Sequence, residues 1–136
     1  MADAVRERTG IDFPALASVE EANARLAGLG IDEPQPSIGE AMVRAFEHAV
    51  EPTLVQPTLV YGHPVEISPL ARRNDRNELV VDRFQLVVNG WEIVNAYSEL
   101  IDPIDQRQRL EQQAAARQAG DEEAMELDED FLLCME

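Results

Sequence analysis

The sequence predicts an α+β fold in which an antiparallel sheet is flanked by helices. Residues 84–88 and 91–97 are rich in β-branched and aromatic side chains, and only Asn89-Gly90 separates them. Both residues of that pair tolerate the positive φ of a type I′ turn, so the two segments are expected to form a hairpin. Capping boxes, each a serine followed three positions later by a glutamate, begin at Ser18 and Ser37 and open helices. We expect one domain over residues 1–136, with a mainly helical part at 1–53, antiparallel strands at 54–102 and C-terminal helices at 103–136.

The helices have recognisable ends. Residues 2–8 are expected to form a helix that closes at Gly10, where glycine supplies a left-handed cap. The first capping box opens a short helix that ends near Gly28. The second opens a more strongly amphipathic helix, whose buried stripe is formed by Ile38, Met42, Ala45, Phe46 and Ala49. Asp102-Pro103 provides an N-cap and a proline at the first helical position, which predicts a long helix that runs to Ala119.

The segment before the hairpin is predicted to contain two further strands. Thr58–Tyr61 and Val65–Ile67 contain β-branched or aromatic residues and lie on either side of a loop that contains His63. Residues 71–79 are rich in arginine and asparagine, and we expect them to form a polar loop that leads into the hairpin.

Composition restricts the classes of function. Eleven basic residues against 27 acidic ones leave a formal charge of −16, which disfavours autonomous binding to nucleic acid. One cysteine, Cys134, suits a reducing compartment, and no apolar run approaches the length of a membrane span. His48 and His63 lie far apart in sequence without cysteine or aspartate nearby, so a zinc site is not predicted. We expect a cytoplasmic protein without a membrane partner.

Polar groups recur along the second strand of the hairpin and its continuation. Asn95, Tyr97 and Glu99 place an amide, a phenol and a carboxylate at every second position of an otherwise apolar segment. Polar groups in a buried strand need a ligand or a hydrogen-bonding network to satisfy them. The alternative for Glu99 is a strand-end glutamate that reaches solvent, because glutamate is mostly exposed in proteins.

Several ordered blocks of sequence resemble class II lysyl-tRNA synthetases. The likeness runs from about Thr9 to the last residue and is strongest over residues 54–107. Its blocks are Gln56-Pro57-Thr58, His63-Pro64, Glu66-Ile67-Ser68-Pro69-Leu70-Ala71-Arg72, Trp91 to Leu100, Asp102-Pro103 and Asp105-Gln106-Arg107. The resemblance implies the central part of a class II aminoacyl-tRNA synthetase catalytic domain, and hence an incomplete catalytic fold.

The resemblance also implies roles for individual residues. Glu99 would pair with the ε-ammonium group of lysine, and Asn95 and Tyr97 would orient the amino acid. Glu92 resembles a glutamate that holds Mg²⁺ against the phosphates of ATP, but its partner position is occupied by the neutral Gln85. A magnesium site is therefore weakened, because hard cations prefer carboxylate oxygens.

The alternation of side chains along a strand limits which residues can contact the same ligand. A strict period of two places Glu92 on one face and Asn95 on the other. If all these residues serve one ligand, a β-bulge must lie between Glu92 and Asn95. With a two-residue turn, Val87 is expected to oppose Glu92, and Gln85 to oppose Val94.

The parent reaction implied by the resemblance is ATP-dependent activation of lysine and its transfer to tRNA. The family's two catalytic arginine motifs are not found in these 136 residues, so we expect a fragment or truncated relative that is inactive by itself. L-lysine is the expected partner of the chain, ATP and tRNA are expected only for a full enzyme, and exposed sheet edges favour a homo-oligomer. Two alternatives remain: a non-catalytic lysine-binding module, or an interaction scaffold without a ligand in which Trp91 makes the contact.

Overall fold

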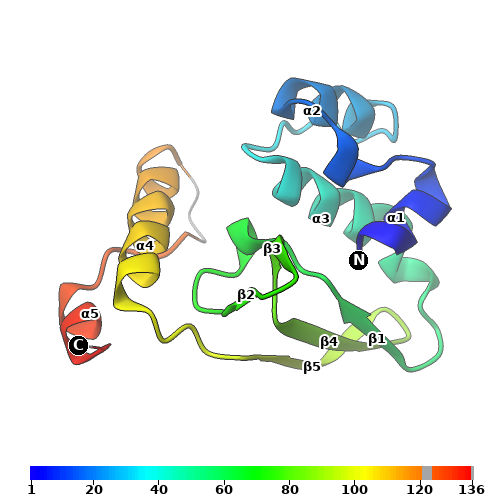
Figure 1. Ribbon diagram of the computed structural model, residues 1–136. Helices are drawn as coiled ribbons and strands as arrows, with labels where there is room; N and C mark the ends of the chain where they lie inside the picture. The colour runs from blue at the N-terminus through cyan, green and yellow to red at the C-terminus, as the bar shows by residue number, and fades with distance from the viewer. Residues whose placement is uncertain (121–123, 136) are drawn as a thin grey trace.

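The computed structural model describes residues 1–120 and 124–135, and it confirms an α+β fold (Figure 1). The helices are α1 (Ala2–Thr9), α2 (Val19–Ala27), α3 (Ile38–Ala49), α4 (Pro103–Gln118) and α5 (Glu129–Met135), and the short 3-10 turns are η1 (Phe13–Ala15), η2 (Glu51–Thr53) and η3 (Val65–Ile67). The strands are β1 (Thr58–Tyr61), β2 (Arg73–Asn74), β3 (Asn77–Val81), β4 (Arg83–Val88) and β5 (Trp91–Tyr97).

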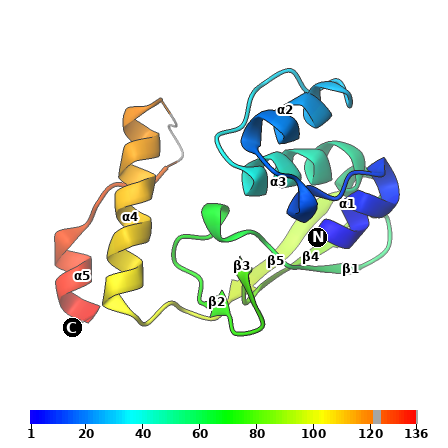
Figure 2. The same cartoon turned by 45° about the horizontal axis from the view of Figure 1, so that its top comes forward.

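The first three helices form a layer beside a three-stranded antiparallel sheet, and both views show this layer on one side of the molecule (Figures 1 and 2). The predicted capping boxes are present: the Ser18 hydroxyl accepts from the Glu21 amide at 3.3 Å, and the Ser37 hydroxyl accepts from the Glu40 amide at 3.0 Å. The core lies between the layer and the sheet, and its largest contributions come from Val5, Phe13, Leu26, Met42, Phe46, Val60 and Val87. Burial of these side chains removes the apolar face of each helix from water.

The sheet has the strand order β1-β4-β5, with β4 in the centre. The predicted hairpin joins β4 to β5, and its turn has the expected positive φ at Asn89 (52°) and Gly90 (73°). One sheet face contributes Val60 and Val87 to the core. The opposite face carries exposed apolar side chains, among them Leu59, Tyr61, Trp91 and Val94.

The predicted strand Val65–Ile67 is wrong, because these residues form the 3-10 turn η3. The extended stretch ends at Pro64, which makes an isolated antiparallel bridge with Val80. Proline has no amide hydrogen to continue a ladder, and after it the chain turns back instead of extending.

The predicted loop 71–79 is also wrong in part, because it contains the small hairpin of β2 and β3. The side-chain oxygen of Asn74 accepts from the amides of Arg76 and Asn77, at 3.0 and 3.1 Å. An asparagine side chain that accepts from amides two and three residues further on stabilises a turn without a glycine. The Asn74-Asp75 pair was the sequence signal for this hairpin.

The C-terminal helices stand apart from the helical layer, across the polar β2-β3 hairpin (Figure 1). Asp102 caps α4, since its carboxylate accepts from the amides of Ile104 and Asp105 at 2.9 and 3.4 Å. Arg107 and Glu129 join α4 to α5 through two hydrogen bonds of 2.8 and 2.6 Å. Among the described residues, no helix is both long and apolar enough to cross a membrane.

Candidate functional site

A β-bulge lies in β5, where the sequence predicted one. Val87 pairs with Glu92, but the next partner of the hairpin is Leu86 with Val94, so Ile93 is the extra residue. Beyond it, Gln85 pairs with Asn95 rather than with the predicted Val94. The bulge shifts the side-chain alternation by one residue, so Glu92 and Asn95 share the face that contributes Val87 to the core.

Two polar side chains on this face and a histidine from the loop after β1 form a chain of hydrogen bonds from the interior to the surface. The buried His63 contacts the side-chain oxygen of Gln85 through Nε2 at 2.8 Å. Gln85 in turn donates from its Nε2 to a carboxylate oxygen of Glu92. A carboxylate can only accept, so the amide group of Gln85 must point its NH₂ toward Glu92 and its oxygen toward His63.

This orientation also determines the tautomer of His63. The oxygen of Gln85 needs a donor, so Nε2 of His63 carries the proton and Nδ1 is left as an acceptor. Nδ1 is buried and has no hydrogen-bond partner in the described part of the chain. Burial lowers the pKa of His63 more than its hydrogen bond to Gln85 raises it. His63 is therefore mainly neutral at pH 7.

A second set of contacts is centred on Arg83, which pairs with Tyr97 across the hairpin. The Nε–H of Arg83 donates to the side-chain oxygen of Asn95 at 3.0 Å. Its other guanidinium nitrogen donates to the hydroxyl of Ser68 at 2.9 Å and to the carbonyl oxygen of Ile67 at 3.4 Å. Burial lowers the pKa of Arg83, but from so high a starting value that the guanidinium stays charged.

The structure places two of the predicted lysine-binding residues, Asn95 and Tyr97, on β5 and the third, Glu99, two residues beyond its end, and their side chains are exposed. Tyr97 is 43% exposed, and Asn95 and Glu99 are also exposed. Glu99 makes an isolated backbone bridge with Ala71, while its carboxylate makes no hydrogen bond or ion pair with the described residues. A hollow of about 920 Å³ lies between α3 and α4, and none of these three residues lines it. The lysine site therefore remains a prediction, based on a strand face rather than on an enclosed cavity.

The residues around Glu92 do not fit a magnesium site. Gln85 directs an NH₂ group at one oxygen of Glu92, and that group cannot coordinate a cation through its hydrogens. His63, the third residue of the hydrogen-bond chain, contributes a buried imidazole. Mg²⁺ prefers oxygen ligands, so this nitrogen ligand does not favour the ion. Across the described residues, no group of three or more histidine, cysteine, aspartate or glutamate side chains could hold a metal ion.

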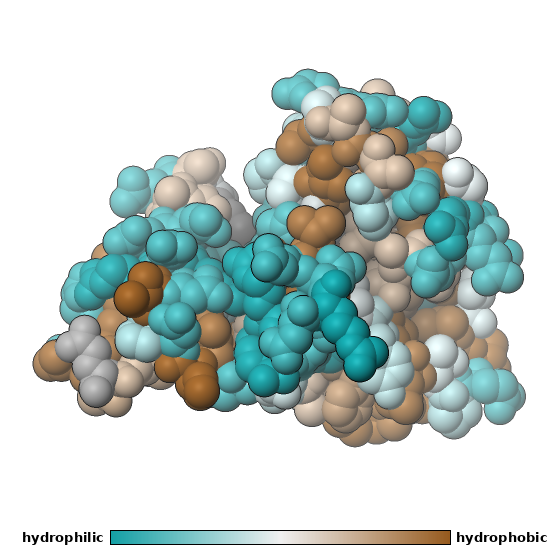
Figure 3. Space-filling model, in the orientation of Figure 1, coloured by the Kyte–Doolittle hydropathy of each residue, from teal (hydrophilic) through white to brown (hydrophobic). Residues whose placement is uncertain are grey.

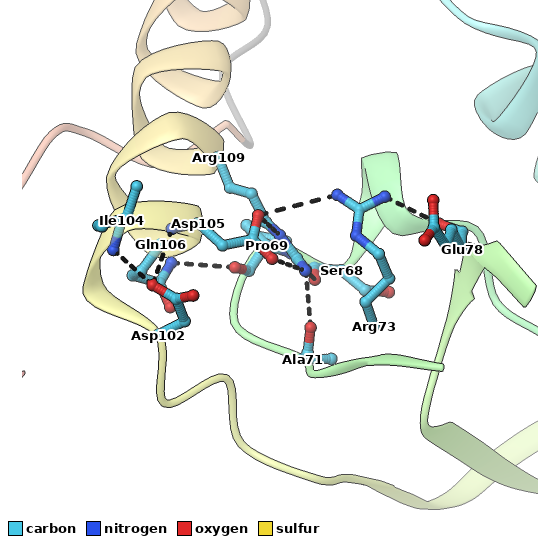
Figure 4. A network of polar contacts seen from close by, with 10 residues as sticks. All are labelled: Ser68, Pro69, Ala71, Arg73, Glu78, Asp102, Ile104, Asp105, Gln106 and Arg109. Atoms are coloured by element: carbon cyan, nitrogen blue, oxygen red, sulfur yellow. Dashed lines mark hydrogen bonds and ion pairs between the residues drawn. The ribbon is translucent and has the colours of Figure 1, made fainter. Parts of the chain in front are cut away.

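Sequence reasoning missed a buried network that holds the segment after η3 against α4 (Figure 4). Arg109 is 5% exposed, and it donates to both carboxylate oxygens of Asp105 at 3.0 and 2.7 Å. It also donates to the carbonyl oxygens of Ser68 at 3.3 Å and Ala71 at 2.7 Å. The buried Gln106 donates to the carbonyl oxygen of Pro69 at 3.0 Å. Together these side chains satisfy carbonyl groups that the turn of η3 leaves without partners in a regular ladder.

The segment that this network holds is also hydrogen-bonded to the backbone at the end of the candidate strand. The amide of Arg72 donates to the carbonyl oxygen of Ser98 at 2.7 Å, and the amide of Leu100 donates to that of Leu70 at 2.9 Å. Glu99 lies between these two bonds, so the backbone that carries its carboxylate is clamped to the segment that Arg109 holds. The sequence signal was an amide side chain and a cationic side chain, Gln106 and Arg109, four and seven positions after the N-cap Asp102. This signal does not reveal their partners.

Comparisons with known proteins agree with this arrangement of motifs. The model of the family "tRNA synthetases class II (D, K and N)" matches residues 2–136. A lysine–tRNA ligase of Lactiplantibacillus plantarum is 50% identical over 137 residues, which cover 100% of this chain and 28% of that protein. Those of Synechococcus sp. (strain CC9605) and Prochlorococcus marinus (strain MIT 9313) are 50% and 49% identical over 138 residues, again over 100% of this chain and 28% and 27% of theirs.

The chain thus spans little more than a quarter of the length of the curated relatives it matches. The family match nevertheless covers all but the first of its 136 residues. On this evidence the chain belongs to the class II tRNA synthetases (D, K and N).

Proposed function

We propose that this chain supplies the lysine-recognition strand of a lysine–tRNA ligase catalytic domain. The observation that carries the proposal is the bulge at Ile93, since it brings Glu92, Asn95 and Tyr97 to one face of β5. Glu99 continues the same alternation at the end of the strand. The face then offers an amide, a phenol and two carboxylates to a ligand that carries both an ammonium and a carboxylate group.

The full reaction is proposed for the longer polypeptide that the relatives represent. There, lysine would be activated with ATP and transferred to tRNA, and this chain would contribute recognition of the amino acid. Mg²⁺ with ATP is the cofactor that this family relationship suggests. In this chain Gln85 and Glu92 do not fit the ion, so no step of the proposal depends on a metal held here.

The test of lysine recognition uses the whole chain and isothermal titration calorimetry. We expect L-lysine to bind and norleucine, which lacks the ε-amino group, to bind more weakly. Glu99→Gln should weaken lysine binding by up to about fivefold, because an exposed ion pair contributes roughly 0.2–1 kcal/mol. It should leave norleucine binding unchanged.

Glu78→Gln provides a matched control, because Glu78 is an exposed carboxylate on β3, away from the candidate face. It should leave the affinity for lysine as it is in the parent chain. Absence of lysine binding by the parent chain would sink the proposal, as would a Glu99→Gln variant that still prefers lysine over norleucine to the same degree.

A second candidate function, association with another copy of the chain, is favoured by the apolar face of the sheet. Leu59 is 50% exposed, Tyr61 56% and Trp91 73%, on the face opposite to the core. Figure 3 shows hydrophobic surface along the lower margin of the molecule, where Figure 1 places the sheet. Contiguous exposed apolar surface of this kind is typical of interaction sites.

Sedimentation velocity tests whether the apolar face associates. We expect the parent chain to sediment as a dimer or larger species, and Trp91→Ala to shift it toward the monomer, because a large aromatic anchor is lost from the contact. Leu133→Ala is the control, since Leu133 is 69% exposed but lies on α5. A parent chain that is monomeric at all concentrations would exclude this second function without affecting lysine recognition.

A further inference from the structure

We infer that the hollow between α3 and α4 is a docking site for a basic segment of a partner protein, in which arginine or lysine side chains lie next to apolar ones. The inference is independent of the proposed recognition of lysine, because no residue of the candidate strand face lines this hollow. It rests on the volume of the hollow, on its apolar walls and on its charge.

The hollow lies where two parts of the chain meet at one turn. Both ribbon views place α3 and α4 on either side of the turn η3, and Figure 3 shows a notch between the two parts at the upper margin (Figures 1, 2 and 3). The volume of about 920 Å³ lies near the top of the range of ligand sites, which is roughly 300–1,000 Å³. The hollow is therefore large enough for several side chains of a peptide.

Apolar side chains and proline rings form much of the wall. Val43 of α3 and Ile67 of η3 lie on it, together with Pro34, Pro36 and Pro69. Proline has no amide hydrogen, so these three positions offer ring surface and no backbone donor. Apolar side chains of a partner can be removed from water against this surface.

Carboxylates outnumber guanidinium groups in the lining of the hollow. Among the described lining residues four are glutamates, and Arg44 is the one basic side chain. Arg44 pairs with Glu47 at 2.8 Å and with Glu33 at 3.9 Å, so its own charge is already compensated. The lining thus keeps a negative charge, which favours a cation.

The carboxylate of Glu66 is held at the wall and has no cationic partner among the described residues. A Cβ atom built on Gly39 would lie 2.6 Å from Oε2 of Glu66, so this carboxylate packs directly on the first turn of α3. The backbone carbonyl oxygen of Glu66 accepts from Nε2 of Gln113 at 3.3 Å, which attaches the residue to α4 as well. Glu66 is exposed, and its carboxylate is therefore open to a guanidinium or ammonium group.

These features favour a basic peptide segment over other partners. The acidic lining repels the phosphates of nucleic acid, and the formal charge of −16 repels them further. A purely apolar ligand would leave the carboxylates without a partner. Arginine or lysine beside leucine matches both parts of the wall, because each cation meets a carboxylate while the leucine covers the proline rings.

Fluorescence anisotropy with labelled octapeptides tests the inference on the whole chain. The probe alternates arginine with leucine, one comparison peptide alternates arginine with serine, and another alternates glutamate with leucine. We expect the probe to bind and the glutamate peptide not to bind. The serine peptide should bind about tenfold more weakly than the probe, since it buries no leucine against the wall.

Two substitutions in the lining should change the affinity for the probe in opposite directions. Glu66→Gln should weaken binding by up to about fivefold, which is the effect of one exposed ion pair. Arg44→Gln should strengthen binding by a similar factor, because it removes the basic side chain of the lining, and partial unfolding cannot produce a gain. Glu111→Gln is the matched control, since Glu111 is an exposed carboxylate on α4 that does not line the hollow.

Equal weakening by Glu66→Gln and Glu111→Gln would overturn the inference, because the probe would then respond only to the overall charge. A glutamate peptide that binds as tightly as the probe would overturn it too. Sedimentation velocity tests the other occupant: if the parent chain is a dimer that both the probe and Glu66→Gln dissociate, a second copy fills the hollow and the inference is wrong. Glu66→Gln should leave lysine binding unchanged, so probe binding without lysine binding would contradict only the proposed function.

Discussion

Arg109→Met is expected to lower the free energy of unfolding of the chain by about 3–5 kcal/mol, which is the usual cost of removing one partner of a buried ion pair. The guanidinium group is 5% exposed and makes four hydrogen bonds, two to Asp105 and two to backbone carbonyl groups. Methionine keeps most of the side-chain volume but leaves the carboxylate and both carbonyl groups without these donors. Loss of this magnitude is a large part of the 5–15 kcal/mol that typically holds a domain folded.

Urea denaturation measures this loss, and Arg107→Met on the same helix is the matched control. Arg107 pairs with Glu129 at the surface, where the two side chains are 43% and 62% exposed, so its removal should cost no more than about 1 kcal/mol. Equal losses for the two variants would contradict the role of Arg109. If Arg109→Met is too unstable to purify folded, Arg109→Lys, which keeps the charge but cannot bind bidentately, should show a smaller loss in the same direction.

The difference between the parent chain and Arg109→Met should also depend on pH. Hydrogen bonds from Arg109 are the largest cause of the lowered pKa of Asp105. A carboxyl group whose pKa is lower in the folded state stabilises the fold above its unfolded pKa of about 3.9, and this contribution is lost as pH falls through the folded pKa. The difference in unfolding free energy should therefore be largest near neutral pH and shrink in acid.

Gln85→Glu is expected to raise the affinity of the chain for a divalent cation by about tenfold or more. In the parent chain the NH₂ group of Gln85 occupies one oxygen of Glu92. A second carboxylate at this position would place two negative charges within hydrogen-bond distance, and such a pair needs either a shared proton or a cation between them. Binding of Mn²⁺, followed by electron paramagnetic resonance as a spectroscopic substitute for Mg²⁺, measures the gain.

Gln85→Met is the control for this substitution, because it removes the same hydrogen bond without adding charge. It should not raise the affinity for Mn²⁺. The change should be specific to the pair, so Gln85→Glu combined with Glu92→Gln should return the affinity to that of the parent chain. A Gln85→Glu variant that binds Mn²⁺ no better than the parent would show that the two side chains cannot share an ion on this strand face.

Local sequence was sufficient to predict the hairpin, whereas its bulge followed from the expectation that polar residues of β5 serve one ligand. Asn89-Gly90 determined the turn, because few residue pairs accept positive φ at both positions. The bulge was predicted from function, since polar residues at Glu92 and Asn95 could share a face only if one residue between them was extra. The pairing of Gln85 with Val94 was wrong for the same reason, since that prediction counted the strand without its bulge.

Two other errors have different causes, one a tertiary contact and the other a local turn. Val65–Ile67 has the β-branched residues of a strand, yet its neighbour Pro64 interrupts the ladder and its carbonyl groups turn toward Arg83 and α4. Residues 71–79 have the polarity of a loop, yet Asn74 folds them into a hairpin. The partners of Val65–Ile67 lie in other elements, so propensity along the chain could not identify them. The contacts of Asn74 are local, and the Asn74-Asp75 signal was overlooked.

The sequence by itself determined the α+β class, the starts of the capped helices, the hairpin and the family, because turns, caps and motifs are encoded by residues close together in the chain. Only the tertiary structure decided how the polar groups are used. It alone showed that the buried His63 contacts Gln85, that Arg83 donates to Asn95, and that Arg109 holds the segment next to Glu99. The physical reason is that a hydrogen bond between elements depends on distance and direction in space, and the residues that make it are separated in the chain by tens of positions.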